Sequence, residues 1–549
     1  MALFLTFITA MFITMLLIPP LMRSAHRLQI VDMPNDRKVH TGAIPRIGGI
    51  AMVAGAIMPI VIWMTPDAKE ASLLWGMAII FIFGIWDDRK DLDYRIKFFG
   101  QTLAVFVVVF IGDVVITTLP AIDMQPIPWF ISYPLTILFL LGITNAINLA
   151  DGLDGLAGGT ALLSLGVIAL LAYMEGDVDL LLISLAILGS ILGFLRFNTH
   201  PARVFMGDGG SQFLGFSVGV LVLLLTQHEN APISAALPLL LLGLPILDTV
   251  MVMVTRVREG RSPFSPDKNH IHHRLLALGF THYEAVFTIY VTQAALVLTA
   301  YSMCYESDIT IMMVFIVFCA SVIACFRYAT IIDWQFRGMS ETATASYVGR
   351  ALKWLHAGAE GKITFWASIL AAILVSGYFV IVAATVSEVS KDLGLLAAGL
   401  FMIHAVRLAV GGKQSFSWLE RACVYSLCAV AGYLSSTDND MSILHTPAEM
   451  IFYVVLAVTV VIGFRFSMDR AFMINTLDFL VIFAVFTVPN LPGQVLSIYN
   501  MGEFLAKLIV LFYAIELILT RIELHWRLYA LRTATVAAAG WIGLRGIAG

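Results

Sequence analysis

Residues 145–159 read NAINLADGLDGLAGG and stand between two apolar runs, 129–148 and 156–174. Each run has roughly the 20-residue length that crosses a bilayer as a helix. Ionisable side chains at membrane depth are costly, and where they occur they usually mark a functional site. The stretch therefore predicts a membrane protein that holds a polar site where two of its helices meet.

The composition supports this class. Of the 549 residues, 59% are hydrophobic and only 13% are charged, whereas a soluble domain carries about 25% charged residues. We therefore expect an all-α, polytopic integral membrane protein. The formal net charge of −4 says little about partners, and we expect no nucleic acid among them. The cysteines lie in or beside apolar runs without metal-ligand spacing, so we interpret them as reduced core residues.

Seventeen apolar segments have the length of membrane spans, and the first is interpreted as a retained helix because its basic residues follow it. About eleven belong to a predicted catalytic core at 1–330, and about six to a C-terminal extension at 363–549. Residues 331–362 are predicted to be a cytoplasmic linker, with an interfacial amphipathic helix as one reading. The segments are 3–22, 44–64, 71–86, 98–118, 129–148, 156–174, 179–196, 211–227, 233–255, 284–304, 310–327, 363–386, 393–410, 418–435, 449–466, 472–489 and 504–520.

The distribution of lysine and arginine predicts the orientation. These residues collect in the connections after the odd-numbered segments, whereas the other connections are short and mostly acidic. Basic loops stay in the cytoplasm, so the N-terminus is expected outside and the C-terminus inside. Every unusual polar stretch then faces the cytoplasm. A transporter, the alternative reading, would instead place such residues near the bilayer midplane.

The stretch WDDRKDLDYRIKFFGQ (86–101) carries three neighbouring carboxylates, Asp87, Asp88 and Asp91. On a helical turn they would share one face. Their mutual repulsion is tolerable where a divalent cation or a proton is shared among them. The alternative is a solvated helix start with Arg89 and Lys90 as neighbours.

In the opening stretch, spacing by threes brings Asn145, Asn148, Asp151 and Asp154 together on a tight turn or helix end. Oxygen ligands of this kind suit Mg²⁺, which also keeps waters and substrate phosphate in its shell. The interspersed glycines permit close approach of the backbone. Ordinary turn chemistry would account for the glycines and one of these residues.

FMGDGGSQFLG (205–215) presents Asp208 in a glycine-flanked turn at the start of the next apolar helix. Such a turn can offer backbone N–H groups to phosphate oxygens. Ordinary helix capping is the alternative.

SPFSPDKNHIHHRL (262–275) gathers His270, His272 and His273 behind Lys268. We interpret them as hydrogen-bond donors to phosphate. A zinc site lacks its usual cysteine or i,i+4 partner here, and a surface loop without function stays open.

Together these stretches resemble the polyprenyl-phosphate N-acetylhexosamine-1-phosphate transferases, membrane enzymes that start bacterial glycan chains on a lipid carrier. The resemblance covers roughly 1–330 and rests on five motifs in family order. They are the Arg-Lys…Pro-Arg-x-Gly-Gly stretch within 31–49, the Asp-Asp pair, NxxNxxDGxDGLAxG, the GDxGS turn and the His box. The form of the His box is most similar to the branch that uses UDP-N-acetylglucosamine.

The resemblance implies transfer of a sugar phosphate from a UDP-sugar to undecaprenyl phosphate, with release of UMP, at the bacterial inner membrane. It implies Mg²⁺, with Mn²⁺ able to substitute, at Asp208 with Asn145 or Asn148. Further implied roles are binding or deprotonation of the lipid phosphate by Asp87 and Asp88, and nucleotide binding or tuning of the metal site by Asp151 and Asp154. Contacts to the anionic substrates are implied for Arg37, Lys38, Arg46, Asp91, Arg261, Lys268, His270, His272 and His273.

The six later segments carry no clustered motif. We interpret the extension as a scaffold or an oligomer surface, including that of a homodimer, with a fused second activity as the alternative.

Overall fold

In the computed structural model the described residues are 2–32, 43–90, 92–122, 126–227, 232–262, 269–336, 360–386, 388–409, 418–437, 447–465, 480, 501–520 and 525–548. The chain divides into two compact units. The first comprises Met1–Glu341 with Asn475–Leu480, and the second comprises Thr342–Ile474 with Val481–Gly549. Most of the predicted linker, 337–359, lies outside the described residues.

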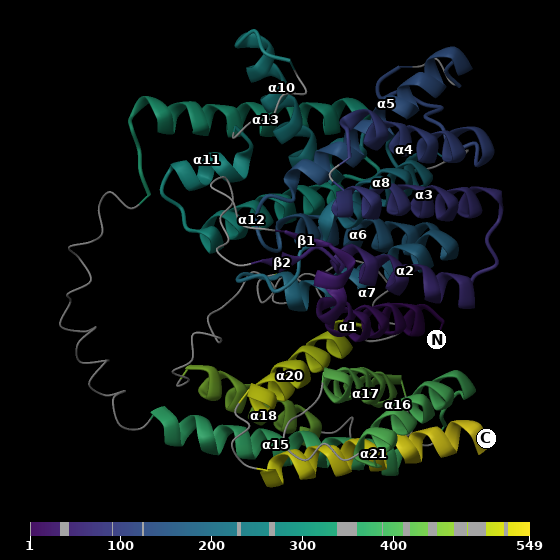
Figure 1. Cartoon of the computed structure of the whole chain (residues 1–549), viewed down its shortest axis with the longest axis vertical. Coiled ribbons are helices and arrows are strands. Elements are labelled where there is room, and N and C mark those ends of the chain that lie inside the picture. The colour runs from purple at the N-terminus through teal and green to yellow at the C-terminus, as the bar shows by residue number, and fades with distance from the viewer. Residues whose placement is uncertain are drawn as a thin grey trace. The chain divides into compact units, whose positions relative to one another are not determined.

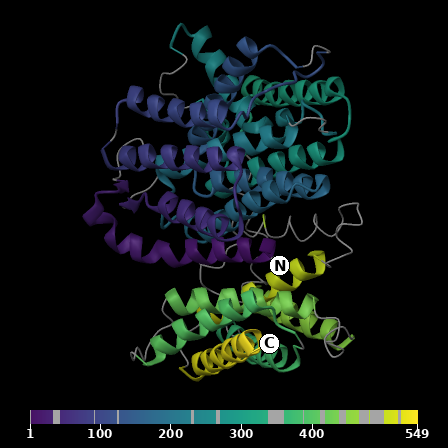
Figure 2. The ribbon, with the colours of Figure 1, turned by 90° about the vertical axis from the view of Figure 1, so that its right-hand side faces the viewer.

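The first unit is built from helices, drawn purple to teal in Figure 1 and seen from the side in Figure 2. Its strands β1 (Val31–Asp32) and β2 (Ile44–Pro45) form a two-stranded antiparallel ribbon that the all-α expectation did not include. The helices are α1 (Ala2–Leu28), α2 (Gly48–Trp63), α3 (Ala68–Lys90), α4 (Tyr94–Phe106) with the π-turn η1 (Val107–Ile111), α5 (Trp129–Ala150), α6 (Leu156–Glu175), α7 (Val178–Asn198), α8 (Gly207–Thr226), α9 (Pro238–Leu241), α10 (Gly243–Arg258), α11 (Ile271–Ala277), α12 (His282–Ser302) and α13 (Asp308–Ile331).

Ten helices in the described part of the chain are long and apolar enough to cross a membrane. This confirms a polytopic membrane protein, while the predicted counts of eleven and six spans stay predictions. The helix α2 is shorter, with 16 residues. Residues 472–489, predicted as a span, lie outside the described residues apart from position 480.

Two predicted spans differ from the structure. The segment 233–255 is broken at Leu242 into α9 and α10. Proline lacks an N–H group and is accepted in the first turn of a helix, and Pro238 and Pro245 both lie in such turns. The helix in the predicted segment 98–118 ends earlier than expected, at Ile111. Its last turn is π-helical, and Gly112 caps it.

The helix α8 forms the centre of the first unit. In an apolar stretch of 18 residues within α8, 94% is buried, whereas in the corresponding stretch of α13 only 6% is buried. The helices α3, α5, α6 and α2 all pack on α8, and α1 packs on α7 and α2. Because a helix that is apolar all round must be buried in protein or in lipid, α8 is the protein core and α13 presents its surface to the bilayer.

This packing brings several helix ends together. The C-terminal ends of α3 and α5 and the N-terminal end of α8 carry polar residues singled out above, namely Asp87, Asp88, Asn145, Asn148 and Asp208. The fold adds Lys97 near the start of α4, His200 just after α7 and His282 at the start of α12. The loop before α8 is tied to β2, since Phe205 N–H donates to Pro45 O at 2.8 Å and Gly48 N–H donates to Phe205 O at 2.9 Å. Six segments of the chain thus deliver side chains to one end of the helix bundle.

The second unit is a separate group of helices, green to yellow in Figure 1. Here α16 packs on α21 and α15 packs on α21, α18 and α20. Among its described residues, Ile363–Thr385 meets the criteria of a membrane span. The helices are α15 (Glu360–Thr385), α16 (Lys391–Ala409), α17 (Trp418–Thr437), α18 (Pro447–Arg465), α20 (Met501–Thr520) and α21 (His525–Ala548).

Candidate active site

Asp208 and Asp87 lie on either side of Lys97. The Lys97 ammonium is 2.5 Å from Asp87 Oδ2 and 3.1 Å from Asp208 Oδ2. Asp87 lies in the last turn of α3 and is 3% exposed, whereas the Asp208 side chain, in the first turn of α8, is 35% exposed. Asp87 also accepts the N–H of Leu92 at 2.7 Å. The site therefore holds two carboxylates from distant segments, linked by one cation and open on the Asp208 side.

Asp88 has a different environment from its neighbour. Its Oδ1 accepts the N–H of Asp208 at 2.8 Å and its Oδ2 accepts the N–H of Gly209 at 3.1 Å. These are N–H groups of the first turn of α8, which have no partner within the helix. Gly207 has a φ of +70°, and a Cβ there would lie 2.4 Å from Asp88 Oδ2. Asp88 therefore caps the helix that carries Asp208.

Of the two asparagines, Asn148 is the one bonded to Asp208. Its Nδ2 donates to Ser211 Oγ at 2.7 Å and makes a longer contact of 3.4 Å with Asp208 Oδ1. Asn145, one turn earlier on α5, donates to Gln101 Oε1 at 2.9 Å and to Leu141 O at 2.8 Å. Asn145 thus belongs to a polar contact between α4 and α5, beside the carboxylate cluster.

The loop 151–155 carries Asp151 and Asp154 between α5 and α6. Burial, together with the negative charges of Asp208 and Asp154, raises the pKa of Asp151 to about 7. Asp154 accepts the N–H of Ala202 at 3.0 Å. Burial opposes its ionisation, but bonds from His200 and Ala202 outweigh burial and lower the pKa of Asp154.

The His box contacts the same loop. A Cβ at Gly152 would lie 2.3 Å from His272 Nε2, so only glycine permits this approach. Burial, followed by the proximity of His273, lowers the pKa of His272 to about 3. His272 is therefore neutral at neutral pH and faces the loop as an uncharged hydrogen-bonding group. Its Nε2 is buried and makes no hydrogen bond within the described part of the chain.

His270 is held in place by Asp248. Its Nδ1 lies 2.7 Å from Asp248 Oδ2, and Asp248 Oδ1 accepts the N–H of Ile271 at 2.7 Å. The sequence suggested a loop for this segment, but His270 precedes a short helix, α11, whose first N–H Asp248 caps. His273 lies beside His272, with ring centroids 4.2 Å apart.

Of the other predicted substrate-binding residues, the structure describes Arg46 and Arg261. Arg46 forms an ion pair with Asp32 of the β-ribbon. Burial opposes the charge of Arg46, but Asp32, and then Asp88, raise the pKa of its guanidinium. Arg261 lies 3.0 Å from Glu259 and is 40% exposed. The predicted residues Arg37, Lys38, Asp91 and Lys268 lie outside the described residues.

Sequence reasoning missed several side chains that the fold adds. Asp248 could have been found, because a lone carboxylate inside an apolar run is itself a signal. Lys97 and Ser211 fall inside motifs that were noted, but their spacing gave no reason to choose them. His200 and His282 contact Asp154 across 46 and 128 residues of sequence, and no local pattern marks them.

Comparison with known proteins identifies the family. Residues 71–226 match the model of glycosyl transferase family 4. A Bacillus subtilis protein named probable undecaprenyl-phosphate N-acetylglucosaminyl 1-phosphate transferase is 38% identical over 286 residues, which cover 52% of this chain and 80% of that protein.

Two further relatives agree. The undecaprenyl-phosphate alpha-N-acetylglucosaminyl 1-phosphate transferase of Escherichia coli K12 is 34% identical over 50% of this chain and 76% of that protein. The decaprenyl-phosphate N-acetylglucosaminephosphotransferase of Mycobacterium leprae is 35% identical over 48% of this chain and 75% of that protein. These matches favour a transferase over the transporter alternative. The chain belongs to glycosyl transferase family 4 and is a multi-pass membrane transferase of the polyprenyl-phosphate N-acetylhexosamine-1-phosphate type.

Proposed function

We propose that this protein transfers N-acetylglucosamine-1-phosphate from UDP-N-acetylglucosamine to undecaprenyl phosphate and releases UMP. The donor sugar and the lipid acceptor are those in the names of the Bacillus and Escherichia relatives. The observation that carries the proposal is the cluster of Asp87, Lys97, Asn148 and Asp208, which brings three charged side chains and one amide from four helices to one end of the bundle.

The cluster suits Mg²⁺. Carboxylate, amide and hydroxyl oxygens are its preferred protein ligands, and Asp208, Asn148 and Ser211 offer one of each within a single hydrogen-bonded group. Asp208 would hold the ion, with Asn148 as co-ligand after its amide oxygen turns inward. When bound, Mg²⁺ would offset the negative charge of the phosphates, and Mn²⁺, which favours similar ligands, would substitute.

The reaction joins two anions, so its main requirement is charge compensation and alignment. An oxygen of the lipid phosphate bonds to the phosphorus that carries the sugar, and the bond from that phosphorus to the bridging oxygen breaks. UMP then leaves with that oxygen. Lys97 would pair with the phosphates. His272 would offer an uncharged hydrogen-bonding group beside the loop 151–155. His270 would be held in its orientation by Asp248.

A general base is not essential for this step. A phosphate monoester has a second pKa of about 6 and is largely a dianion at pH 7. Both oxygens of Asp88 are used by the first turn of α8. We therefore assign Asp88 the positioning of Asp208, and we assign Asp87 the positioning of Lys97 and of the lipid phosphate.

We further propose that the site faces the cytoplasm of a bacterial inner membrane. The test uses a version without native cysteines that carries either Arg261→Cys, at the end of the bundle with the site, or Asp177→Cys, at the start of α7. Both positions are exposed. A membrane-impermeant thiol reagent should label the first only from the cytoplasmic side and the second only from outside. The reverse pattern would overturn the orientation.

The function itself is tested with purified, detergent-solubilised protein, undecaprenyl phosphate, Mg²⁺ and a panel of UDP-sugars. Release of UMP should be greatest with UDP-N-acetylglucosamine. UDP-N-acetylgalactosamine differs by the configuration of one hydroxyl group, so a preference for it would change only the donor assignment. Absence of UMP with every donor would reject the proposed reaction.

A further inference from the structure

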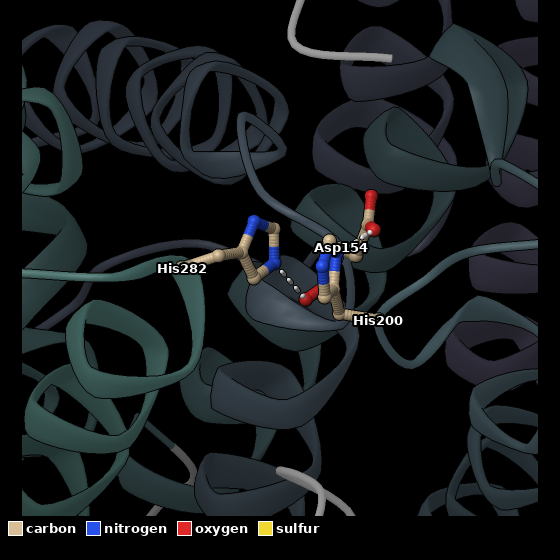
Figure 3. Close-up of side chains that lie close together, drawn as sticks. All are labelled: Asp154, His200 and His282. Carbon is tan, nitrogen blue, oxygen red and sulfur yellow. Dashed lines mark hydrogen bonds and ion pairs between the residues drawn. The ribbon is translucent and has the colours of Figure 1, made fainter. Parts of the chain in front are cut away.

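Three side chains from distant segments meet at the loop 151–155. They are Asp154 in that loop, His200 after α7, and His282 at the first residue of α12 (Figure 3). One potential ligand atom from each lies within 4.8 Å of the other two. All three side chains are partly exposed, so the group is accessible to an ion from solvent.

The contacts within this group are close. His200 Nδ1 lies 2.6 Å from Asp154 Oδ2, and the rings of His200 and His282 stack with centroids 4.0 Å apart and planes 23° apart. His282 Nε2 approaches the backbone oxygen of Asp154 at 3.4 Å. His282 Nδ1 is buried and has no hydrogen-bond partner in the described part of the chain.

Charge explains why this arrangement favours a bound cation. Two imidazolium rings stacked face to face would repel each other, whereas two neutral rings beside a carboxylate offer lone pairs and one negative charge. The Asp154 carboxyl is held ionised by the bonds from His200 and Ala202. The group can therefore offer a metal ion two imidazole nitrogens and one anionic oxygen.

We propose that Asp154, His200 and His282 form a transition-metal site, with Zn²⁺ as the best fit, separate from the Mg²⁺ cluster at Asp208. Zinc binds histidine nitrogen and carboxylate oxygen, and sites with three protein ligands keep a fourth position for water. Mg²⁺ prefers an all-oxygen, octahedral shell, which this group does not supply. On binding, the ion replaces the hydrogen bond between His200 and Asp154.

The site would fasten three parts of the active-site region together. Tyr283 already donates to His200 O at 3.1 Å, and Tyr290 donates to Gly155 O at 2.6 Å. An ion at Asp154 would add a stronger link between α12, the loop before α8 and the loop that carries Asp151. Because a metal that binds only the folded state stabilises it, we expect Zn²⁺ to raise the Tm of the protein.

The experiment measures metal binding directly and does not depend on the proposed transferase reaction. Full-length protein in detergent is stripped with a chelator, and Zn²⁺ is titrated by calorimetry while Co²⁺ is followed by its visible absorption. One equivalent should bind. His200→Gln and His282→Gln should each weaken binding by about ten-fold or more, because even the loss of a group that only orients a ligand has an effect of this size, and should abolish the rise in Tm.

Two matched controls locate the ion. His26→Gln, at an exposed position near the end of α1, should bind like the unmodified protein. His273→Gln tests the His box in the same way and should also retain the ion. Absence of binding would overturn the proposal, and so would binding that is lost in His273→Gln but kept in both His200→Gln and His282→Gln. The Tm of each variant without metal shows that it is folded.

Discussion

The first unit gathers acidic side chains at helix ends, where Asp87 and Asp208 lie around Lys97, Asp88 caps the helix of Asp208, and one side is open to solvent. The second unit buries charge in matched pairs. Glu420 of α17 lies 2.9 Å from Arg532 of α21. A cluster with more carboxylates than cations is stabilised when a further cation binds, whereas a matched ion pair is already neutral. From this comparison we expect the first cluster to bind ligands and the pairs of the second unit to hold helices together.

The second matched pair follows the same rule. Lys507 of α20 lies 2.7 Å from Glu449 of α18, with exposures of 7% and 5%. The ammonium is also 5.7 Å from the ring of Tyr453. Both pairs link helices that are distant in sequence, as expected for a scaffold. This supports the structural interpretation of the extension over a second activity.

The largest effect is expected at the acidic cluster. Asp208→Asn removes one charge with little change in volume, and UMP release should fall by about 10³-fold or more, because charge compensation is the main contribution to phosphoryl transfer. The measurement is UMP release over a range of Mg²⁺ concentrations. Asp67→Asn, exposed just before α3 at the other end of that helix, is the matched control and should keep full activity.

Near-normal activity of Asp208→Asn at ordinary Mg²⁺ concentration would show that the acidic cluster of the first unit is not a ligand site. Its carboxylates would then be structural, like the ion pairs of the second unit. Asp208 would then be only a residue of the first turn of α8.

Particular residues illustrate what the sequence could and could not predict. The apolar runs were sufficient to predict the membrane class, and the five motifs in their order were sufficient to predict the family, while the roles of the site residues stay predictions. The different environments of Asp87 and Asp88 were not predictable, because they depend on the contact of α3 with α8, 120 residues away. Histidines that meet only after folding, such as His200 and His282, lack any signal of local periodicity.

The next effect concerns the stability of the second unit. Glu420→Gln leaves Arg532 buried without its charge partner, which typically costs about 3–5 kcal/mol. Replacing both by leucine should restore most of this stability, because a buried pair and an apolar pair are often equivalent. Chemical unfolding of the unmodified protein, Glu420→Leu, Arg532→Leu and the double leucine variant completes a double-mutant cycle that measures the coupling, and UMP release should be unchanged in every variant that folds.

Loss of UMP release from a folded Glu420→Gln variant would contradict the scaffold interpretation. The extension would then take part in the reaction or in its regulation.

The smallest effect is expected from removing the extension, since every motif of the site precedes residue 331. The structure also refines where to cut. Phe336 stacks on Phe280 with centroids 4.5 Å apart, and its N–H donates to Leu278 O at 2.9 Å, close to α11 and the His box. A chain ending at residue 341 keeps these contacts, and a chain ending at 330 loses them. Both should release UMP, and the longer one should have the higher Tm because it keeps the aromatic contact between Phe336 and Phe280. If the chain ending at 341 inserts and folds but is inactive, the extension completes the site or maintains an obligatory oligomer, and the two units are not independent.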